Sequence, residues 1–513
     1  MKKQSLIKGA LILVGAGIIN RIIGFAYRIG VMRTVGPEGV GLYEMVFPLY
    51  TLALVIITAG IPIALAKTVA ELEAKRHFKS IYKLMFFSLC FMTFTSVLAI
   101  IIIVVLRPVL LPKLLPDPRS IFPFMTMVPA LILVALSSIL RGYFQGLQQM
   151  TPSAVSQICE QVVRTTLGIT LAYKLLPYGP AYAATGLAAG MVIGETVGLI
   201  SLLVFYRFSS LRRKIDSNAS TEENFHSLIR KIMTLSFPIT SARIVTASIM
   251  SIQAILIPRR LQAAGLSVSE STTVFGEFTG IALSLISLPT LFSNSMAISL
   301  VPAISEGLAK GQNQAVQRRI QVALSATIIT GLPWAILYFL LPREISQMIF
   351  GVNGAAQTLQ LLAMGCVFLY IQQTTIGILQ GLGRVDIALK HIVLGAILNL
   401  GLVYHLTGIE SLSIRGTAIA YSATWFSVSM LNLYRLLELK QISLDIKEMV
   451  VAPVIGSVGM TIAIILTWWQ LQQSFFPPAF CTLVSIVGGL AIYFGLVYFN
   501  SDTLRSYAKI RKL

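Results

Sequence analysis

Charged residues are scarce in this sequence. Only 12% of its 513 residues are Asp, Glu, Lys or Arg, about half the share that is typical of soluble domains. Hydrophobic residues make up 56% of the chain. This composition excludes an ordinary soluble globular protein and indicates a chain that lies largely in lipid.

Cysteine and histidine are also rare, with four of each. Cys90, Cys159, Cys366 and Cys481 lie within apolar runs and show no paired spacing, so we predict neither a disulfide nor a metal site. The histidines are scattered singly in or near predicted loops, and no nucleophile lies beside a base. We therefore expect no catalytic residues, no metal and no cofactor, and a protein that is not an enzyme.

Long apolar runs recur along the whole chain. A helix needs about 20 apolar residues to cross a bilayer of about 30 Å. By this criterion we predict fourteen transmembrane spans, at residues 6–32, 42–66, 82–106, 121–145, 153–175, 181–206, 232–257, 272–302, 316–341, 356–380, 387–407, 413–435, 449–470 and 478–500. The first is too long for a signal peptide and contains Arg21 and Arg28, so we expect it to be a retained helix.

Acidic residues are half as numerous as basic ones, and the net charge is +20. With both termini placed in the cytoplasm, 27 of the 40 Lys and Arg residues fall on the inner side, nine on the outer side and four within spans. This split is the positive-inside signature. It explains the basic balance without a nucleic-acid partner, and predicts a multi-pass protein of the cell (cytoplasmic) membrane with cytoplasmic N- and C-termini.

Short sequence matches recur at one offset, which predicts an internal repeat. The tripeptide QGL occurs at residues 145–147 and again 235 residues later, at 380–382. Leu65 and Glu71 match Leu300 and Glu306 at the same offset, and a third match starts at Ala184 and, 234 residues on, at Ala418. Six spans form an even-numbered unit, so the two halves should be parallel repeats.

These observations predict an all-α integral membrane fold of two six-helix lobes around a central cavity, plus a C-terminal helix hairpin. The N-lobe is expected at residues 1–208 and the C-lobe at 209–440. The hairpin and a cytoplasmic tail are expected at 441–513. Lobes of this kind are typical of alternating-access transporters.

Four arginines lie within the predicted spans, where a charged side chain is costly and usually faces a wet cavity or a partner. Arg21 and Arg28 are seven residues apart and share a helix face. Arg243 lies in the span that corresponds to the first span in the repeat, so it should face Arg21. A planar guanidinium is well matched to phosphate oxygens. We predict Arg21, Arg28, Arg243 and Arg164 as substrate-binding residues for an anionic cargo, although Arg28 and Arg243 could instead lie at the membrane interfaces.

Three glutamates lie five or more residues inside a predicted span. Glu160 and Arg164 are spaced i, i+4, which predicts a mutually neutralising ion pair, with a substrate or gating role as the alternative. Glu195 and Glu277 have no partner nearby in sequence, and each could pair with an arginine of another helix or bind H+ or Na+. We therefore predict Glu160, Glu195 and Glu277 as gating or ion-coupling residues.

Two motifs resemble a known transporter family. Residues 36–43 read GPEGVGLY and are similar to a turn of polysaccharide exporters. Residues 60–67 read GIPIALAK and resemble the end of the second span in the stage V sporulation protein B group. The fourteen-span layout is similar to lipid II flippases of the multidrug/oligosaccharidyl-lipid/polysaccharide (MOP) superfamily. Residues 20–27 read NRIIGFAY: Arg21 matches the first arginine of the flippase pattern, whereas Tyr27 occupies the position of the second.

The resemblance implies a flippase that moves an undecaprenyl-diphosphate-linked saccharide, with a precursor of spore cortex peptidoglycan as the cargo. Membrane lipids and cell-wall synthesis proteins are the other partners it suggests. A cation-coupled multidrug antiporter of the same superfamily is the main alternative, and its cavity should be acidic or neutral. A membrane glycosyltransferase would need a large outer loop with clustered carboxylates, and the predicted outer loops are short. A non-transporting scaffold remains open.

Overall fold

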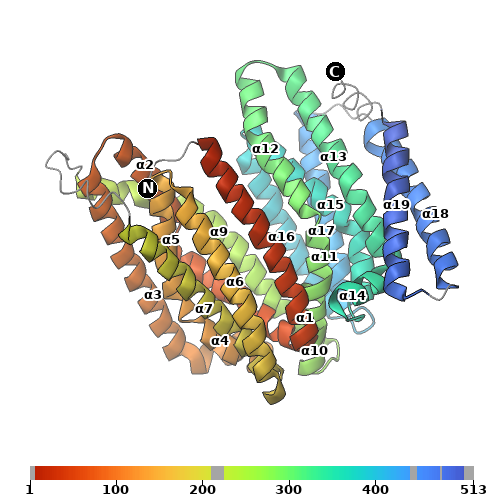
Figure 1. Ribbon diagram of the computed structural model, residues 1–513, viewed down its shortest axis with the longest axis horizontal. Coiled ribbons are helices and arrows are strands. Elements are labelled where there is room, and N and C mark those ends of the chain that lie inside the picture. Colours follow the sequence, from red (N-terminus) through yellow and green to blue (C-terminus); the bar gives the residue numbers. More distant parts are fainter. Residues whose placement is uncertain (1–5, 209–223, 440–446, 474–475, 502–513) are drawn as a thin grey trace. The chain divides into compact units, whose positions relative to one another are not determined.

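The chain is helical throughout the part that the structure describes. The computed structural model describes residues 6–208, 224–439, 447–473 and 476–501, and these residues contain helices and no strand (Figure 1). The predicted boundaries at 208/209 and 440/441, and the tail after residue 501, lie at or within residues outside this description.

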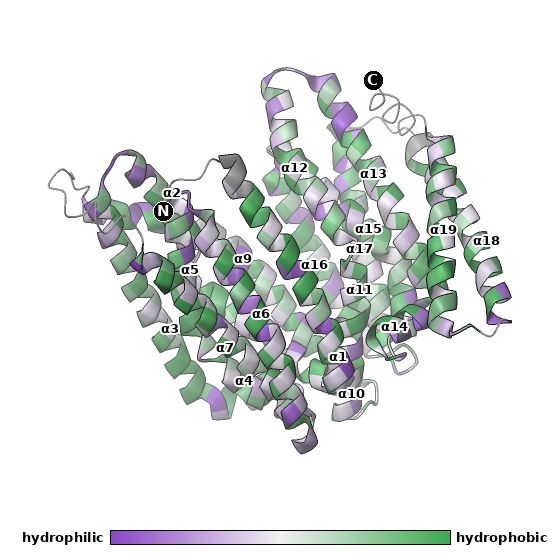
Figure 2. Cartoon of the chain, viewed as in Figure 1, coloured by the Kyte–Doolittle hydropathy of each residue, from purple (hydrophilic) through white to green (hydrophobic). Residues whose placement is uncertain are grey.

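The α-helices of the described residues cover the long apolar runs of the sequence. They are α1 (Leu6–Thr58), α2 (Ile61–Ala74), α3 (Phe78–Leu114), α4 (Ile121–Met127), α5 (Ala130–Gly146), α6 (Met150–Leu175), α7 (Pro180–Arg207), α9 (Phe225–Ala263), α10 (Val268–Glu277), α11 (Leu283–Ser287), α12 (Thr290–Ala309), α13 (Asn313–Leu340), α14 (Pro342–Phe350), α15 (Ala356–Gly381), α16 (Val385–Thr407), α17 (Ile414–Glu438), α18 (Ala452–Gln472) and α19 (Pro478–Asn500). Figure 2 shows hydrophobic residues along α3 and α19 and hydrophilic residues at the turn between α12 and α13.

Ten of the described helical stretches are long and apolar enough to cross a membrane, or eleven if one bent pair forms a single span. This shows a multi-pass membrane protein. One stretch, Leu11–Ala74, covers the first two predicted spans, because α1 passes through a kink at Gly36, which has a φ of 79°. The predicted spans at 153–175 and 413–435 coincide with α6 and α17, which are not among these stretches. The prediction of fourteen transmembrane spans therefore remains a proposal.

The predicted span at 272–302 is a broken element. The helix α10 runs into a π-helical turn, η3 (Phe278–Ala282), and then into α11. A bend of 51° separates Val268–Ser287 from Thr290–Ala309. Such π-helical turns occur frequently at functional sites, where they re-aim a helix.

The described residues form two compact units. The first comprises those of Met1–Arg259 and Val268–Gly276, and the second those of Arg260–Ser267 and Glu277–Leu513. The boundary falls within α10, so Val268–Gly276 belong to the first unit, whereas Glu277 and the continuation of the helix belong to the second. The predicted lobe division at residue 209 stays a prediction.

In the first unit, glycines bring α5 against α2. A Cβ atom on Gly142 would lie 2.5 Å from the carbonyl oxygen of Pro62. One on Gly146 would lie 2.6 Å from the carbonyl oxygen of Ala66 and 2.7 Å from Cβ of Val69. Small residues at four-residue spacing allow such close packing of membrane helices.

The second unit repeats this packing between α15 and α12. A Cβ on Gly377 would lie 2.6 Å from Cα of Ala297. One on Gly381 would lie 3.0 Å from Cβ of Ile304 and 3.3 Å from Cα of Val301. All three neighbour pairs of the first unit recur here 235 residues later, the offset predicted from the sequence. The repeat therefore extends from the sequence to the contacts within each unit.

These contacts predict a strong effect of enlarging the glycines. Gly142→Val and Gly377→Val should each destabilise the protein by about 1–3 kcal/mol, because the added atoms overlap a neighbouring helix backbone. Melting temperature of the detergent-purified protein measures the loss. Gly401→Val is the matched control, since nothing lies within 4 Å of a Cβ there. Equal melting of all three variants would contradict the prediction.

Candidate functional site

The predicted arginines of α1 and α9 lie in the first unit with exposed side chains. Among the described residues, no hydrogen bond or ion pair reaches Arg21 or Arg243. Arg28 is also exposed but does interact with another group. An unpaired guanidinium in a membrane span needs water or an anion to compensate its charge. Arg21 and Arg243 thus have the properties expected of residues that bind an anionic cargo.

Arg164 on α6 lies among aromatic side chains of α1. Its Nη2 donates a hydrogen bond of 2.8 Å to the hydroxyl of Tyr43. Its guanidinium carbon lies 5.9 Å from the ring centre of Tyr27 and 5.6 Å from that of Phe47, within the range of cation–π attraction. Its Nε is buried without a partner. The positive charge of Arg164 is therefore stabilised by two aromatic rings and one hydroxyl group of α1.

The ion pair predicted between Glu160 and Arg164 is wrong. Glu160 instead accepts a bond of 2.6 Å from Nη2 of Arg141 on α5, and these side chains are only 14% and 18% exposed. Arg141 also donates to Oγ of Ser156, at 3.1 and 3.2 Å. Sequence spacing cannot reveal this choice, because α5 and α6 meet only in the folded protein. Sequence reasoning missed Arg141 as the partner of Glu160.

Glu195 on α7 is the most buried of the predicted glutamates, with 7% exposure. One of its carboxyl oxygens, Oε2, is buried without a hydrogen-bond partner. Glu160, Arg141 and Arg164 are the charged groups that act electrostatically on it. Glycines allow this proximity: a Cβ on Gly194 would lie 2.9 Å from the carbonyl oxygen of Glu160. The structure thus gathers Glu160, Glu195 and Arg164 into one cluster and adds Arg141.

Glu277, the last residue of α10, belongs to the second unit. Its carboxyl group packs against Gly354, where any added side chain would meet it. No hydrogen bond or ion pair reaches it from the described residues. Its position directly before the π-helical turn η3 suits a residue that responds to bending of this element.

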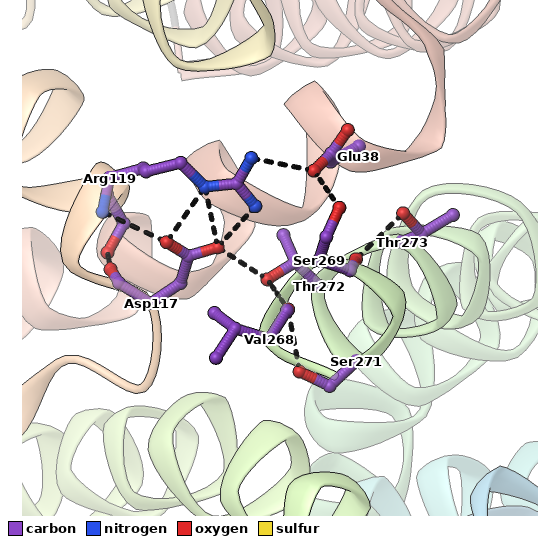
Figure 3. A network of polar contacts seen from close by, with 9 residues as sticks. Glu38, Asp117, Arg119, Val268, Ser269, Ser271, Thr272 and Thr273 are labelled. Atoms are coloured by element: carbon purple, nitrogen blue, oxygen red, sulfur yellow. Dashed lines mark hydrogen bonds and ion pairs between the residues drawn. The ribbon is translucent and has the colours of Figure 1, made fainter. Parts of the chain in front are cut away.

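A second polar network surrounds the buried Asp117, just before α4 (Figure 3). Asp117 accepts a bond of 2.9 Å from the backbone N–H of Arg119 and one of 2.8 Å from Nη2 of the same residue. The hydroxyl of Thr272 on α10 donates to Asp117 at 2.8 Å. Asp117 therefore ties α10 to the turn that precedes α4.

The same network includes the GPEGVGLY motif. Nη1 of Arg119 lies 2.8 Å from Glu38, which also accepts a hydrogen bond from Ser269 (Figure 3). Gly41 and Gly276 leave no room for a side chain, because the backbones of Thr272 and Pro37 pass directly beside them. The GPEGVGLY motif thus packs directly against α10. Sequence reasoning identified Glu38 only through the resemblance and missed Asp117 and Thr272.

This network predicts a stabilising role for Asp117. Asp117→Ala should cost about 1–3 kcal/mol, since Arg119 and Thr272 lose their shared acceptor, and the partial exposure of Arg119 limits the effect. Thr272→Val, which removes one hydrogen bond, should cost less. The melting temperature in detergent reports both losses, with the exposed Glu410→Gln as control. A melting temperature of Asp117→Ala equal to that of the wild type would contradict the prediction.

Comparisons with known proteins agree with the motifs. A family model described as "Polysaccharide biosynthesis protein" matches residues 6–308, and one described as "MatE" matches residues 279–405. "Stage V sporulation protein B" of Bacillus subtilis (strain 168) is 32% identical over 451 residues, which cover 87% of this chain and 86% of that protein. "Lipid II flippase MurJ" of the same organism is 23% identical, over 82% of this chain and 81% of that protein.

Solved structures show the same fold. The inward closed conformation of a lipid II flippase MurJ matches with a TM-score of 0.68 at 14% identity, over 96% of this chain and 98% of that chain. An inward-facing multidrug resistance MATE family transporter of the MOP superfamily also gives 0.68, at 13% identity, over 82% and 96%. The resemblance inferred from the sequence is confirmed. The chain belongs to the polysaccharide biosynthesis protein family, in the stage V sporulation protein B group.

Proposed function

We propose that this protein is a flippase that moves an undecaprenyl-diphosphate-linked saccharide across the cytoplasmic membrane by alternating access. The cargo we favour is a precursor of spore cortex peptidoglycan, and the name of the 32% identical relative supports a role in sporulation. The relative named as a lipid II flippase supports the same class of cargo. Both termini lie in the cytoplasm in this proposal, and fourteen spans form two lobes with a C-terminal hairpin.

The observation that carries the proposal is the pair of unpartnered arginines in the first unit. Arg21 and Arg243 lie in helices that are apolar enough for lipid, yet no described residue compensates either charge. A diphosphate carries several anionic oxygens, and guanidinium groups bind such oxygens through strong, often bidentate bonds. In the proposed mechanism these two residues bind the diphosphate, together with Arg28, while the polyprenyl tail remains in lipid.

The cluster of Glu160, Glu195, Arg164 and Arg141 has a supporting role in this mechanism. Arg164 contributes positive charge to the binding region from among the rings of α1. Glu160, Glu195 and Glu277 act in gating or ion coupling. The break at η3 and the 51° bend after α11 would allow α10 and α12 to move separately as the lobes rock.

The second candidate function is a cation-coupled multidrug antiporter. The MatE match over residues 279–405 and the structural likeness to a MATE transporter favour it. Cationic drugs require an acidic or neutral cavity. The four arginines predicted to bind substrate outnumber the three glutamates predicted for gating or ion coupling, which counts against this function.

Native mass spectrometry of the detergent-purified protein tests the proposal. The protein is offered undecaprenyl-diphosphate lipids with and without a sugar, and in parallel cationic drugs. Retention of the diphosphate lipid, and its loss from Arg21→Ala and Arg243→Ala, is the expected result. Binding of cationic drugs without retention of the lipid would replace the flippase by the antiporter.

A further inference from the structure

Glu195 is a buried acid whose hydrogen bonding is incomplete. It lies in the middle of α7 with 7% exposure, and its Oε2 has no donor. Ionising a buried carboxyl group that has too few hydrogen-bond donors is strongly unfavourable. A bound proton removes that charge and turns the carboxyl group into a donor that can use a neighbouring acceptor.

The neighbouring acceptor is a second carboxyl group. Glu160 on α6 lies close to Glu195, held there by its 2.6 Å bond to Arg141 on α5. A Cβ on Gly198, one turn along α7 from Gly194, would lie only 3.4 Å from Oε2 of Glu160. Neighbouring carboxyl groups share one proton in other proteins, because like charges resist simultaneous ionisation.

The remaining groups around the pair are two cations and three hydroxyls. Arg141 is engaged with Glu160 and Ser156, and Arg164 with the hydroxyl of Tyr43 on α1. Tyr50, also on α1, interacts electrostatically with Glu195, and its hydroxyl is buried without a partner. Two guanidinium groups beside the carboxyl pair repel a metal cation. Among the described residues, no group of three or more His, Cys, Asp or Glu side chains is placed to hold one.

We propose that Glu195 and Glu160 together bind one proton, carried by Glu195 and donated to Glu160, and that its release and rebinding drive the conformational cycle. This inference rests on the proposed function and names its coupling ion as H+. In the binding step, a proton from water attaches to the Glu195 carboxylate. In the release step it returns to water on the other side of the membrane, and Glu160 keeps its bond to Arg141.

Infrared spectroscopy of the full-length protein in lipid tests the proton directly. At neutral pH the wild type should show the C=O band of a protonated carboxylic acid, and Glu195→Gln should lose it. Glu306→Gln, at an exposed acid paired with Lys310, is the control that should retain it. The absence of this band from the wild type would overturn the proposal, as would a band that disappears in Glu277→Gln and persists in Glu195→Gln.

This measurement requires no glycolipid, so its failure is separate from a failure of the flippase assignment. If Glu195→Gln does not fold, titration of the wild-type band decides the matter, together with Glu160→Gln, which should shift the band by removing its acceptor. In proteoliposomes, a pH gradient alone should accelerate wild-type transport several-fold. Acceleration by a sodium gradient alone, with none by a pH gradient, would contradict the proposal.

Discussion

Arg21→Ala and Arg243→Ala should each abolish transport of the lipid-linked saccharide while leaving the protein folded. Each variant loses charge-assisted bonds to the diphosphate, and we expect about tenfold to hundredfold weaker binding per substitution. Neither side chain has a partner among the described residues, so their removal costs the fold little. Complementation of a strain that lacks the protein, with its amount in the membrane measured in parallel, reports the loss.

Two controls separate charge from position in this experiment. Arg21→Lys keeps the positive charge but loses the planar fork, so it should retain partial activity. Arg384→Ala removes an exposed arginine at the start of α16 and should transport as the wild type does. Full complementation by both Arg21→Ala and Arg243→Ala would show that these arginines do not bind the cargo.

Arg141→Met should destabilise the protein more than any other single substitution proposed here, by about 3–5 kcal/mol. The change leaves Glu160 buried without its counter-charge, next to Glu195. The melting temperature and the fraction of monodisperse protein in detergent measure the effect. The double variant Arg141→Met/Glu160→Gln should recover most of the loss, because it removes both charges and leaves none unpaired.

A surface ion pair provides the comparison for this result. Arg435 and Glu438 lie three residues apart on α17, and their side chains are 33% and 49% exposed. Arg435→Met should therefore cost less than about 1 kcal/mol. If Arg141→Met melts like Arg435→Met, the buried pair does not stabilise the first unit.

Local composition was sufficient to predict that this is a helical membrane protein. A transmembrane helix satisfies its backbone hydrogen bonds within itself, so apolar length alone predicts helices such as α3 and α19, whatever their neighbours. The internal repeat could also be detected from the sequence. The QGL matches at offset 235 mark Gly146 and Gly381, and the structure places both at equivalent helix contacts. Glycine carries this signal because only a residue without a side chain permits backbones to approach so closely.

Tertiary structure alone decided which polar groups meet. From spacing, Glu160 and Arg164 should pair, but the fold brings Arg141 to Glu160 and Tyr43 to Arg164. Asp117 and Thr272 are 155 residues apart, and nothing in either local sequence indicates their bond. Pairing energies depend on distance and on the burial that surrounding helices create. The sequence therefore identified the charges in the membrane, and helix packing determined which of them are neutralised and which remain available for a cargo or a proton.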